Sequence, residues 1–499
     1  MWGRMPSCAR LLTALAGTAQ TRPGGLTTRR RLATCPTVLL ALACASMAAD
    51  LPHRLDYLID SNPLAQHANV GIHVVDLKSG KSLYGRNENR LFLPASNLKL
   101  FTSALALQKL GPDYRFTTRL IRESAGDIVL AGSGDPSLNG RAYPYQRDAS
   151  LGPGLASIED LADQAVTAGL REVKGDVIGD DRLYPWSPYP PSWTQDDAIH
   201  ESGAPVSALS VADNIVNIAI SPGSAAGDPA KLTLEPRLEY FAIDNRITTA
   251  AGAGFAEIQV SRLPGARQIL LSGTMRLKAG SVREQVGVDD PALYSAYALQ
   301  EALTRRGVLV RGHPAARHRS PETKYVAPEG ETLAVRISPP LSQILQLLDK
   351  VSENLHAELM LGAAGGLDGL NSFLSSIGGG PRDSRIDDGS GLSRNDQVTP
   401  KLMTRLLAHM YKTNNRDAWI AMLPVGGDDG TLSKRLCCSA GARRIHAKTG
   451  TLARSIALSG YAESKTHGWL AFSIFVNNFA APASEIQAWI DKIALTLTE

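Results

Sequence analysis

A short polar stretch followed by a long apolar run constrains the fold of this sequence most. Residues 94–99 read PASNLK, and the run 100–110 that follows is rich in apolar, helix-forming residues. Gly111-Pro112 then forms a strong helix stop. The pattern predicts a buried helix with Ser96 in its first turn and Lys99 one turn further on the same face. Strand-like segments at 70–77 and 82–85 precede it, so two strands of a sheet lead directly into this helix.

Ser96 and Lys99 are candidates for nucleophilic chemistry. A helix start offers unpaired N–H groups and a positive dipole end, which favour the negative charge of an acyl-transfer intermediate. Burial would lower the pKa of Lys99 and suit its amine to take a proton from Ser96. The plainer interpretation is that Ser96 caps the helix and Lys99 is a solvated charge. The four-residue pattern alone leaves both interpretations open.

The first 49 residues resemble a secretory signal. Arg29-Arg30-Arg31 precede an apolar core at 32–45, and small residues follow at 46–48. The apolar core is too short to span a membrane. A lipid anchor on Cys44 is a second interpretation. Because residues 1–49 hold six arginines and no acid, their removal changes the formal net charge from +4 to −2.

The composition of the remaining chain excludes several classes of protein. A near-neutral mature chain gives no reason to expect a nucleic-acid partner. No later apolar run approaches about 18 residues, so we expect at most peripheral membrane contact. Cys437 and Cys438 alone remain after the signal, too few for a zinc cage or a disulfide framework. We therefore expect neither a metal nor another cofactor, and the role of the two cysteines stays open.

The distribution of strand, helix and turn patterns along the chain predicts three parts after the signal. Residues 50–113 and 333–499 contain strand and helix patterns, whereas 114–332 are rich in turns and short strands, with helices expected at 157–169 and 291–306. Two strands near the front and three near the end predict one sheet closed by distant segments, with 114–332 as an insertion. The Pro- and aromatic-rich loop 184–193 either lines a pocket or is a stiff surface connection.

Two further motifs carry candidate functional groups. Ser352-Glu353-Asn354 stands between two predicted helices, where a hydroxyl can relay a proton and an amide can hold Lys99. Lys448-Thr449-Gly450 precedes Thr451 at a strand, where an ammonium group and a hydroxyl suit a substrate carboxylate and glycine leaves the strand edge open. Taken singly, the first motif is also a helix cap and the second also a turn.

The order of the three motifs resembles that of the serine penicillin-recognising enzymes. Within them the chain is most similar to the class C low-molecular-mass penicillin-binding proteins, the D-alanyl-D-alanine carboxypeptidase/endopeptidases. Ser96 and Ser352 are 256 positions apart, which matches the inserted domains of that family and is too long for a simple β-lactamase. Glu353 stands where aspartate is commoner. Further matching segments are GSGDP at 132–136, GAPVSALS at 203–210 and DGSGLS at 388–393.

The resemblance implies an α/β (α+β) fold: a transpeptidase/β-lactamase-like domain with an antiparallel five-stranded sheet and flanking helices, interrupted by the β-rich insert. It implies a periplasmic serine peptidase that acts on peptidoglycan stem peptides and is acylated by β-lactam antibiotics. The implied catalytic residues are Ser96, Lys99, Ser352 and Asn354, and the implied substrate-binding residues are Lys448, Thr449, Gly450, Thr451 and Asp180.

Several alternatives remain open from the sequence. A β-lactamase or esterase on the same fold is the main rival, and a non-catalytic wall-binding module is a second. Asp181 is the other candidate for the acid that the resemblance places in the insert to bind a free amine of the peptide. The balance of carboxypeptidase and endopeptidase action and the oligomeric state are not determined.

Overall fold

A five-stranded antiparallel sheet joins the two ends of the chain. Its strand order is β18-β19-β20-β1-β2, and every neighbouring pair is antiparallel. The expectation of one such sheet closed by distant segments is confirmed. The strands are β1 (Asn69–Asp76), β2 (Ser82–Arg86), β18 (Ile445–Leu452), β19 (Ser455–Ser464) and β20 (Gly468–Asn477).

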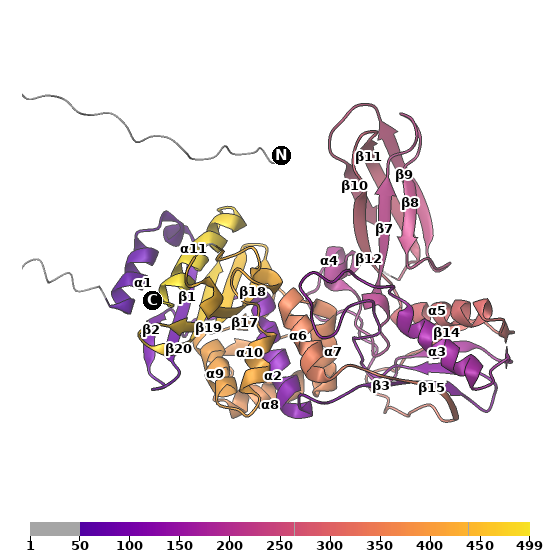
Figure 1. Cartoon of the computed structure of the whole chain (residues 1–499), viewed down its shortest axis with the longest axis horizontal. Helices are drawn as coiled ribbons and strands as arrows, with labels where there is room; N and C mark the ends of the chain where they lie inside the picture. The colour runs from indigo at the N-terminus through magenta and orange to yellow at the C-terminus, as the bar shows by residue number, and fades with distance from the viewer. Residues whose placement is uncertain (1–49, 264, 438) are drawn as a thin grey trace, which may run out of the picture. The chain divides into compact units, whose positions relative to one another are not determined.

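Helices cover both faces of this sheet (Figure 1). Successive side chains of a strand point to opposite faces, so Phe472 packs in the core beneath α1 (Leu51–Asp60) and α11 (Ala483–Thr496), while Phe475 packs in the core on the other side. The helices of that second core are α2 (Lys99–Leu110), α6 (Leu341–Val351), α7 (Asn354–Ala363), α8 (Gly366–Ser376), α9 (Pro400–Tyr411) and α10 (Arg416–Met422).

The segment between α2 and α6 forms its own sheets and cores. Its larger sheet has the order β14-β6-β4-β3-β15 and packs against two helices. The predicted end of the insert at residue 332 falls inside β15, whose pairing with β3 continues to Ile337. These elements are β3 (Thr117–Arg122), β4 (Ile128–Ala131), α3 (Ala156–Thr167), β6 (Val177–Asp180), α5 (Pro291–Arg305), β14 (Pro314–Arg317) and β15 (Glu331–Ile337).

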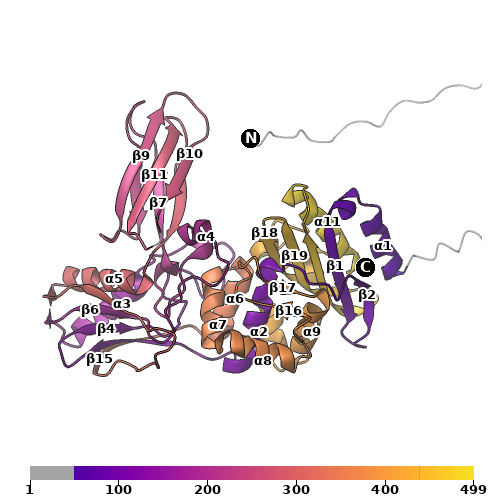
Figure 2. The same cartoon turned by 180° about the vertical axis from the view of Figure 1, so that it is seen from behind.

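Two three-stranded sheets pack together around a fourth, smaller core within the same segment (Figure 2). Their strands are β7 (Ile215–Ser221), β8 (Lys231–Glu235), β9 (Ala242–Ala250), β10 (Glu257–Ser261), β11 (Gln268–Arg276) and β12 (Val282–Gly287). Short elements complete the fold: β5 (Glu172–Val173), β13 (Leu309–Val310), β16 (Ser384–Arg385), β17 (Gln397–Val398) and α4 (Gln195–Ile199).

The computed structural model describes residues 50–263, 265–437 and 439–499. The predicted signal at 1–49 and Cys438 lie outside these ranges. Within them, no helix combines the length and apolar character needed to cross a membrane.

Candidate active site

The predicted nucleophile and its amine lie side by side at the start of α2. Ser96 belongs to a 3-10 turn, Ala95–Leu98, and α2 begins only at Lys99, so the first turn is tighter than the sequence pattern predicted. The Nζ atom of Lys99 donates to Ser96 Oγ at 3.0 Å. Lys99 is fully buried, whereas Ser96 is partly exposed. The arrangement presents a reachable hydroxyl with a desolvated amine behind it.

Two more groups hold the amine of Lys99. Its Nζ donates to Asn354 Oδ1 at 2.6 Å and to the carbonyl oxygen of Ser390 at 2.7 Å. Asn354 begins α7, and Ser390 lies in the DGSGLS segment. Together with Ser96 these acceptors fix the position of the nitrogen. The sequence predicted no role for Ser390, because any residue at this position would supply the same backbone carbonyl group.

The second predicted amine contacts the second predicted hydroxyl. Lys448 Nζ donates to Ser352 Oγ at 2.7 Å and to the carbonyl oxygen of Thr449 at 3.0 Å. Ser352 ends α6 in a left-handed conformation with φ of 69°. Ser352 and Asn354 are only two positions apart, so the structure brings the Lys99 and Lys448 pairs to one turn.

Burial lowers the pKa values of both lysines. The pKa of Lys99 falls to about 8, an effect that Asp388 and other nearby carboxylates partly oppose. Burial and the charge of Lys99 lower the pKa of Lys448 to about 7. Near neutral pH the site therefore holds fewer than two full positive charges, which suits one amine to accept a proton.

The KTG segment lies on β18, the edge strand of the sheet. Thr449 Oγ1 donates to Thr431 Oγ1 at 2.8 Å, a partner that the sequence pattern did not indicate. A Cβ atom on Gly450 would lie 2.7 Å from the carbonyl oxygen of Pro94. Glycine is thus needed for β18 to approach the turn that carries Ser96, in addition to its expected role at the strand edge. Thr451 is exposed on the same strand.

The inserted segment also reaches the site. Asn354 Nδ2 donates to the carbonyl oxygen of Ser202 at 2.7 Å. Trp193 Nε1 donates to Asp388 Oδ2 at 2.9 Å, and Asp388 Oδ1 accepts from the backbone N–H of Gly391 at 2.6 Å. The aromatic loop 184–193 therefore contacts the loop that holds Lys99. Four of its residues, Tyr184, Pro185, Ser187 and Pro190, also line a cavity of about 760 Å³.

The two candidate acids of the insert have other partners. Asp180, at the end of β6, is buried, and its carboxylate accepts from Arg182 Nη2 at 2.6 Å and Nε at 3.0 Å. Asp181 Oδ2 accepts from Ser207 Oγ at 2.9 Å. Asp181 Oδ1 lies 2.9 Å from His318 Nδ1. Among the residues that the structure describes, neither acid bonds to Lys99 or Lys448.

His318 provides a pH-dependent test of stability. Its Nε2 atom lies 3.2 Å from Asp290 Oδ2, and Asp290 caps α5, so the ring joins two carboxylates. Burial alone would lower the pKa of His318, but these two partners outweigh burial and raise the pKa to about 10. The stabilisation is therefore complete below about pH 6.5 and is lost as the pH rises through about 10.

We expect His318→Gln to lower the free energy of unfolding by about 2 kcal/mol at pH 6, since bonds to charged groups contribute about 1.5–3 kcal/mol and partial exposure weakens them. Urea unfolding of both proteins from pH 6 to pH 10.5 measures this. The difference should shrink toward pH 10.5. A difference independent of pH would contradict stabilisation by a protonated His318 between Asp181 and Asp290.

Comparisons with known proteins agree over most of the chain. Residues 51–497 match the D-Ala-D-Ala carboxypeptidase 3 (S13) family. A D-alanyl-D-alanine carboxypeptidase of Actinomadura sp. (strain R39) is 32% identical over 519 residues, which cover 96% of this chain and 92% of that protein. The crystal structure of penicillin binding protein 4 (dacB) from Haemophilus influenzae matches with a TM-score of 0.74 at 21% identity, over 89% of this chain and 97% of that one. The same protein complexed with a novel β-lactam matches with a TM-score of 0.70 at 20% identity, over 89% and 98% of the two chains.

Proposed function

Because this chain belongs to the D-Ala-D-Ala carboxypeptidase 3 (S13) family, we propose that it is a serine-type D-alanyl-D-alanine carboxypeptidase/endopeptidase acting on peptidoglycan stem peptides. One observation carries the proposal for the site. The buried amine of Lys99, with its pKa lowered to about 8, lies 3.0 Å from the hydroxyl of Ser96. A hydroxyl and an amine in this relation form an activated nucleophile.

Acylation starts with proton transfer from Ser96 to the neutral amine of Lys99. Ser96 Oγ attacks the carbonyl carbon of the penultimate D-alanine, and the backbone N–H groups of Ser96 and Thr451 receive the oxyanion. Each such donor typically lowers the barrier by about 2.7–4 kcal/mol. As the C–N bond breaks, Ser352 passes a proton to the leaving D-alanine nitrogen and takes one back from the Lys99 ammonium, which becomes neutral again. The acyl group stays on Ser96.

Deacylation reverses the proton path. Water attacks the ester carbonyl and gives a proton to the neutral Lys99 amine, which passes it to Ser96 Oγ as the bond between Ser96 Oγ and the acyl carbon breaks and the shortened peptide leaves. A cross-linked peptide in the same site yields endopeptidase action. A β-lactam places its strained amide at the same carbon and leaves its ring-opened acyl group on Ser96. The Haemophilus structure with a bound β-lactam supports this part of the proposal by analogy of fold.

Asp180 is the proposed partner for a free amine of the stem peptide. Because Arg182 already binds its carboxylate, a substrate amine has to compete with the guanidinium. The proposal also places the protein in the periplasm. The support for this location is the composition of residues 1–49, which resembles a secretory signal: three arginines, then an apolar core, then small residues at a cleavage site.

A product assay tests the proposed function. The purified protein is incubated with uncross-linked pentapeptide muropeptides and, separately, with cross-linked dimers, and products are separated and weighed by mass spectrometry. We expect free D-alanine from the first substrate and monomers from the second. Absence of both, with rapid turnover of a chromogenic cephalosporin, would favour the β-lactamase alternative.

Lys448 is proposed to bind the terminal carboxylate of the substrate with Thr449. We expect Lys448→Ala to reduce kcat/KM for a peptide with a free carboxylate about 10–100-fold more than for a thioester without one, because a charge-assisted bond contributes about 1.5–3 kcal/mol. Since the pKa of Lys448 is about 7 in the free site, KM for the carboxylate substrate should rise above that pH.

Lys434→Ala provides the matched control, because Lys434 is an exposed lysine outside the motif. It should leave both substrates unaffected. An equal loss on the two substrates in Lys448→Ala would argue against carboxylate binding and would leave only the bond to Ser352 as the role of Lys448.

A further inference from the structure

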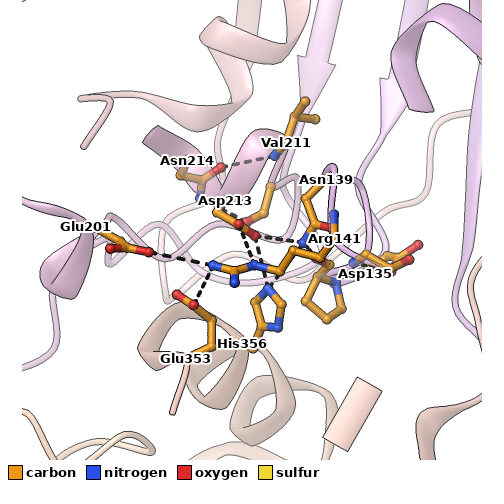
Figure 3. Close-up of polar contacts among 12 residues, drawn as sticks. Asp135, Asn139, Arg141, Glu201, Val211, Asp213, Asn214, Glu353 and His356 are labelled. Carbon is orange, nitrogen blue, oxygen red and sulfur yellow. Dashed lines mark hydrogen bonds and ion pairs between the residues drawn. The ribbon is translucent and has the colours of Figure 1, made fainter. Parts of the chain in front are cut away.

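A buried polar cluster joins the inserted segment to the turn that carries Ser352 and Asn354 (Figure 3). The close-up shows the guanidinium group of Arg141 between Glu201 and Glu353, with Asp213 beside its Nε end. Arg141, Glu201 and Asp213 come from the inserted segment, whereas Glu353 lies between α6 and α7. The mechanism proposed above uses none of these four charges.

The contact to the catalytic turn is short and shielded from water. Arg141 Nη2 donates to Glu353 Oε2 at 2.6 Å, and the two side chains are 13% and 8% exposed. Glu353 is the residue between Ser352 and Asn354. A charge-assisted bond in a site of low dielectric is strong, and loss of one partner leaves the other buried without a counter-charge. The position of Glu353, and with it the turn, therefore depends on Arg141.

Arg141 is itself fixed on the other side. Its Nε donates to Asp213 Oδ2 at 2.8 Å, and Asp213 Oδ1 accepts from Asn139 Nδ2 at 2.8 Å. The same carboxylate lies 3.1 Å from Nε2 of His356, in the first turns of α7. Although burial opposes it, the charge of Arg141 helps hold the pKa of Asp213 below its usual range. Asp213 thus fixes the Nε side of the guanidinium group, while the Nη2 side bonds to Glu353.

The backbone around Asp213 is held in an uncommon conformation. Ala212, Asp213 and Asn214 have φ values of 52°, 55° and 54°, all left-handed. Single non-glycine residues adopt this region rarely, and such segments persist where surrounding contacts enforce them. Asn214 Oδ1 accepts from the N–H of Val211 at 3.1 Å and closes the turn. The uncommon backbone conformation of this segment directs the side chain of Asp213 toward Arg141.

A second bond ties the same turn to the insert. Asn354 Nδ2 donates to the carbonyl oxygen of Ser202, and the preceding residue, Glu201, lies 3.6 Å from Arg141 Nη2. Glu353 and Asn354, the two residues that follow Ser352, therefore both contact the inserted segment. Ser352 itself is left-handed, with φ of 69°, so the direction of its hydroxyl depends on how the two residues that follow it are held.

We propose that Arg141 is a positioning residue: through Glu353 it fixes the turn that presents the Ser352 hydroxyl and the Asn354 amide to the reaction. The inserted segment thereby completes the active site. This inference rests on the proposed acyl-enzyme function, but the side chain of Arg141 bonds to Asp213, Glu201 and Glu353 and not to the hydroxyl of Ser96 or Ser352. It predicts an effect on the acylation step more than on binding.

The test measures acylation by penicillin under saturating and subsaturating conditions, which separates the acylation constant k2 from the binding constant K. We expect Arg141→Met to lower k2 about 10–100-fold, because small displacements of catalytic groups cost this much, and to change K less than threefold. Arg141→Lys keeps the charge but loses the forked geometry, and it should fall between the wild type and Arg141→Met.

Glu353 offers two matched variants. Glu353→Asp keeps the charge but is one methylene shorter, and Glu353→Gln keeps the length but loses the charge. Both should lower k2. If Arg141 acts through Glu353, the double variant Arg141→Met/Glu353→Gln should lose no more k2 than the worse single variant. Multiplied losses would overturn the inference.

The pH profile of k2 provides a readout that a purely structural role does not move. Glu353→Gln removes a carboxylate that favours protonated Lys99, so the acidic limb of k2 should move to lower pH. Arg141→Met removes the counter-charge of that carboxylate, so the limb should move to higher pH. The titratable groups that face Lys99 and stay the same in both variants are Asp388, Glu358, Asp349 and Lys448, and burial raises the pKa values of Glu358 and Asp349 to about 8 and about 7.

Arg317→Met is the control for general destabilisation. Arg317 forms two bonds with Glu123, at 2.7 and 2.9 Å, in the sheet of the inserted segment. It should lower Tm without changing k2. The inference is wrong if Arg141→Met is acylated at the wild-type rate and with the wild-type pH profile. If Arg141→Met does not fold, the same outcome in both Arg141→Lys and Glu353→Gln overturns it. A wild-type protein that forms no adduct at all would instead refute the proposed function.

Discussion

Ser96→Ala should form no covalent adduct with penicillin, whereas the wild-type protein should gain the mass of one ring-opened antibiotic. The reason is that the ester bond needs an oxygen at this position, and Ser96 Oγ is the partly exposed hydroxyl bonded to Lys99. Intact-protein mass spectrometry after incubation at pH 8 measures the adduct. Peptide mapping of the wild-type protein should place the modification on residues around Ser96.

The matched control is Ser103→Ala. Ser103 lies in α2, about two turns after Ser96, is buried, and has no assigned part in the reaction. This variant should acquire the adduct like the wild type, which excludes loss of the helix as the cause of the Ser96 result. A full-strength adduct in Ser96→Ala would end the assignment of the nucleophile.

Lys99→Met should slow acylation by about 10²–10⁴-fold, the range typical for loss of a positioned general base. Methionine is an unbranched apolar side chain suited to a fully buried site, so the variant removes the amine with little change in packing. In the wild type, k2 should rise with pH and level off above about pH 8, because the neutral amine accepts the proton and its pKa is about 8. The variant should lack this rise.

Lys109→Met is the control for Lys99→Met, since Lys109 is exposed in the last turn of the same helix. Its k2 and pH profile should equal those of the wild type. A pH rise that persists unchanged in Lys99→Met would transfer the general-base role to another group. Lys448 would then be the first candidate, because its pKa is lowered to about 7 and it binds Ser352.

Much of the architecture follows from local patterns. The apolar run after Lys99 and the Gly-Pro stop predicted the buried helix α2, which ends at Leu110. The strand patterns at both ends predicted the antiparallel sheet, and the motif order identified the family, as the match over residues 51–497 confirms. Such features are predictable because periodicity, stops and short motifs each involve neighbouring residues.

Other features of the site were not predictable. The 3-10 turn at Ser96 packs against β18, where Gly450 meets the backbone of Pro94. The carbonyl of Ser390 accepts from Lys99 across 291 positions of sequence, and the hydroxyl of Thr431 accepts from Thr449 across 18. Contacts of this kind depend on how whole elements pack, and no short segment encodes them.

The sequence by itself determined the chemistry that is available: a hydroxyl and an amine three positions apart, a second hydroxyl and amide, and an amine on a strand, in one order along the chain. Only the tertiary structure decided which titratable groups have shifted pKa values and which side chains contact one another. Burial lowers the pKa values of Lys99 and Lys448, and burial is a property of the assembled core. The bond from Arg141 to Glu353 spans 212 positions and exists only because the insert folds back against the catalytic turn.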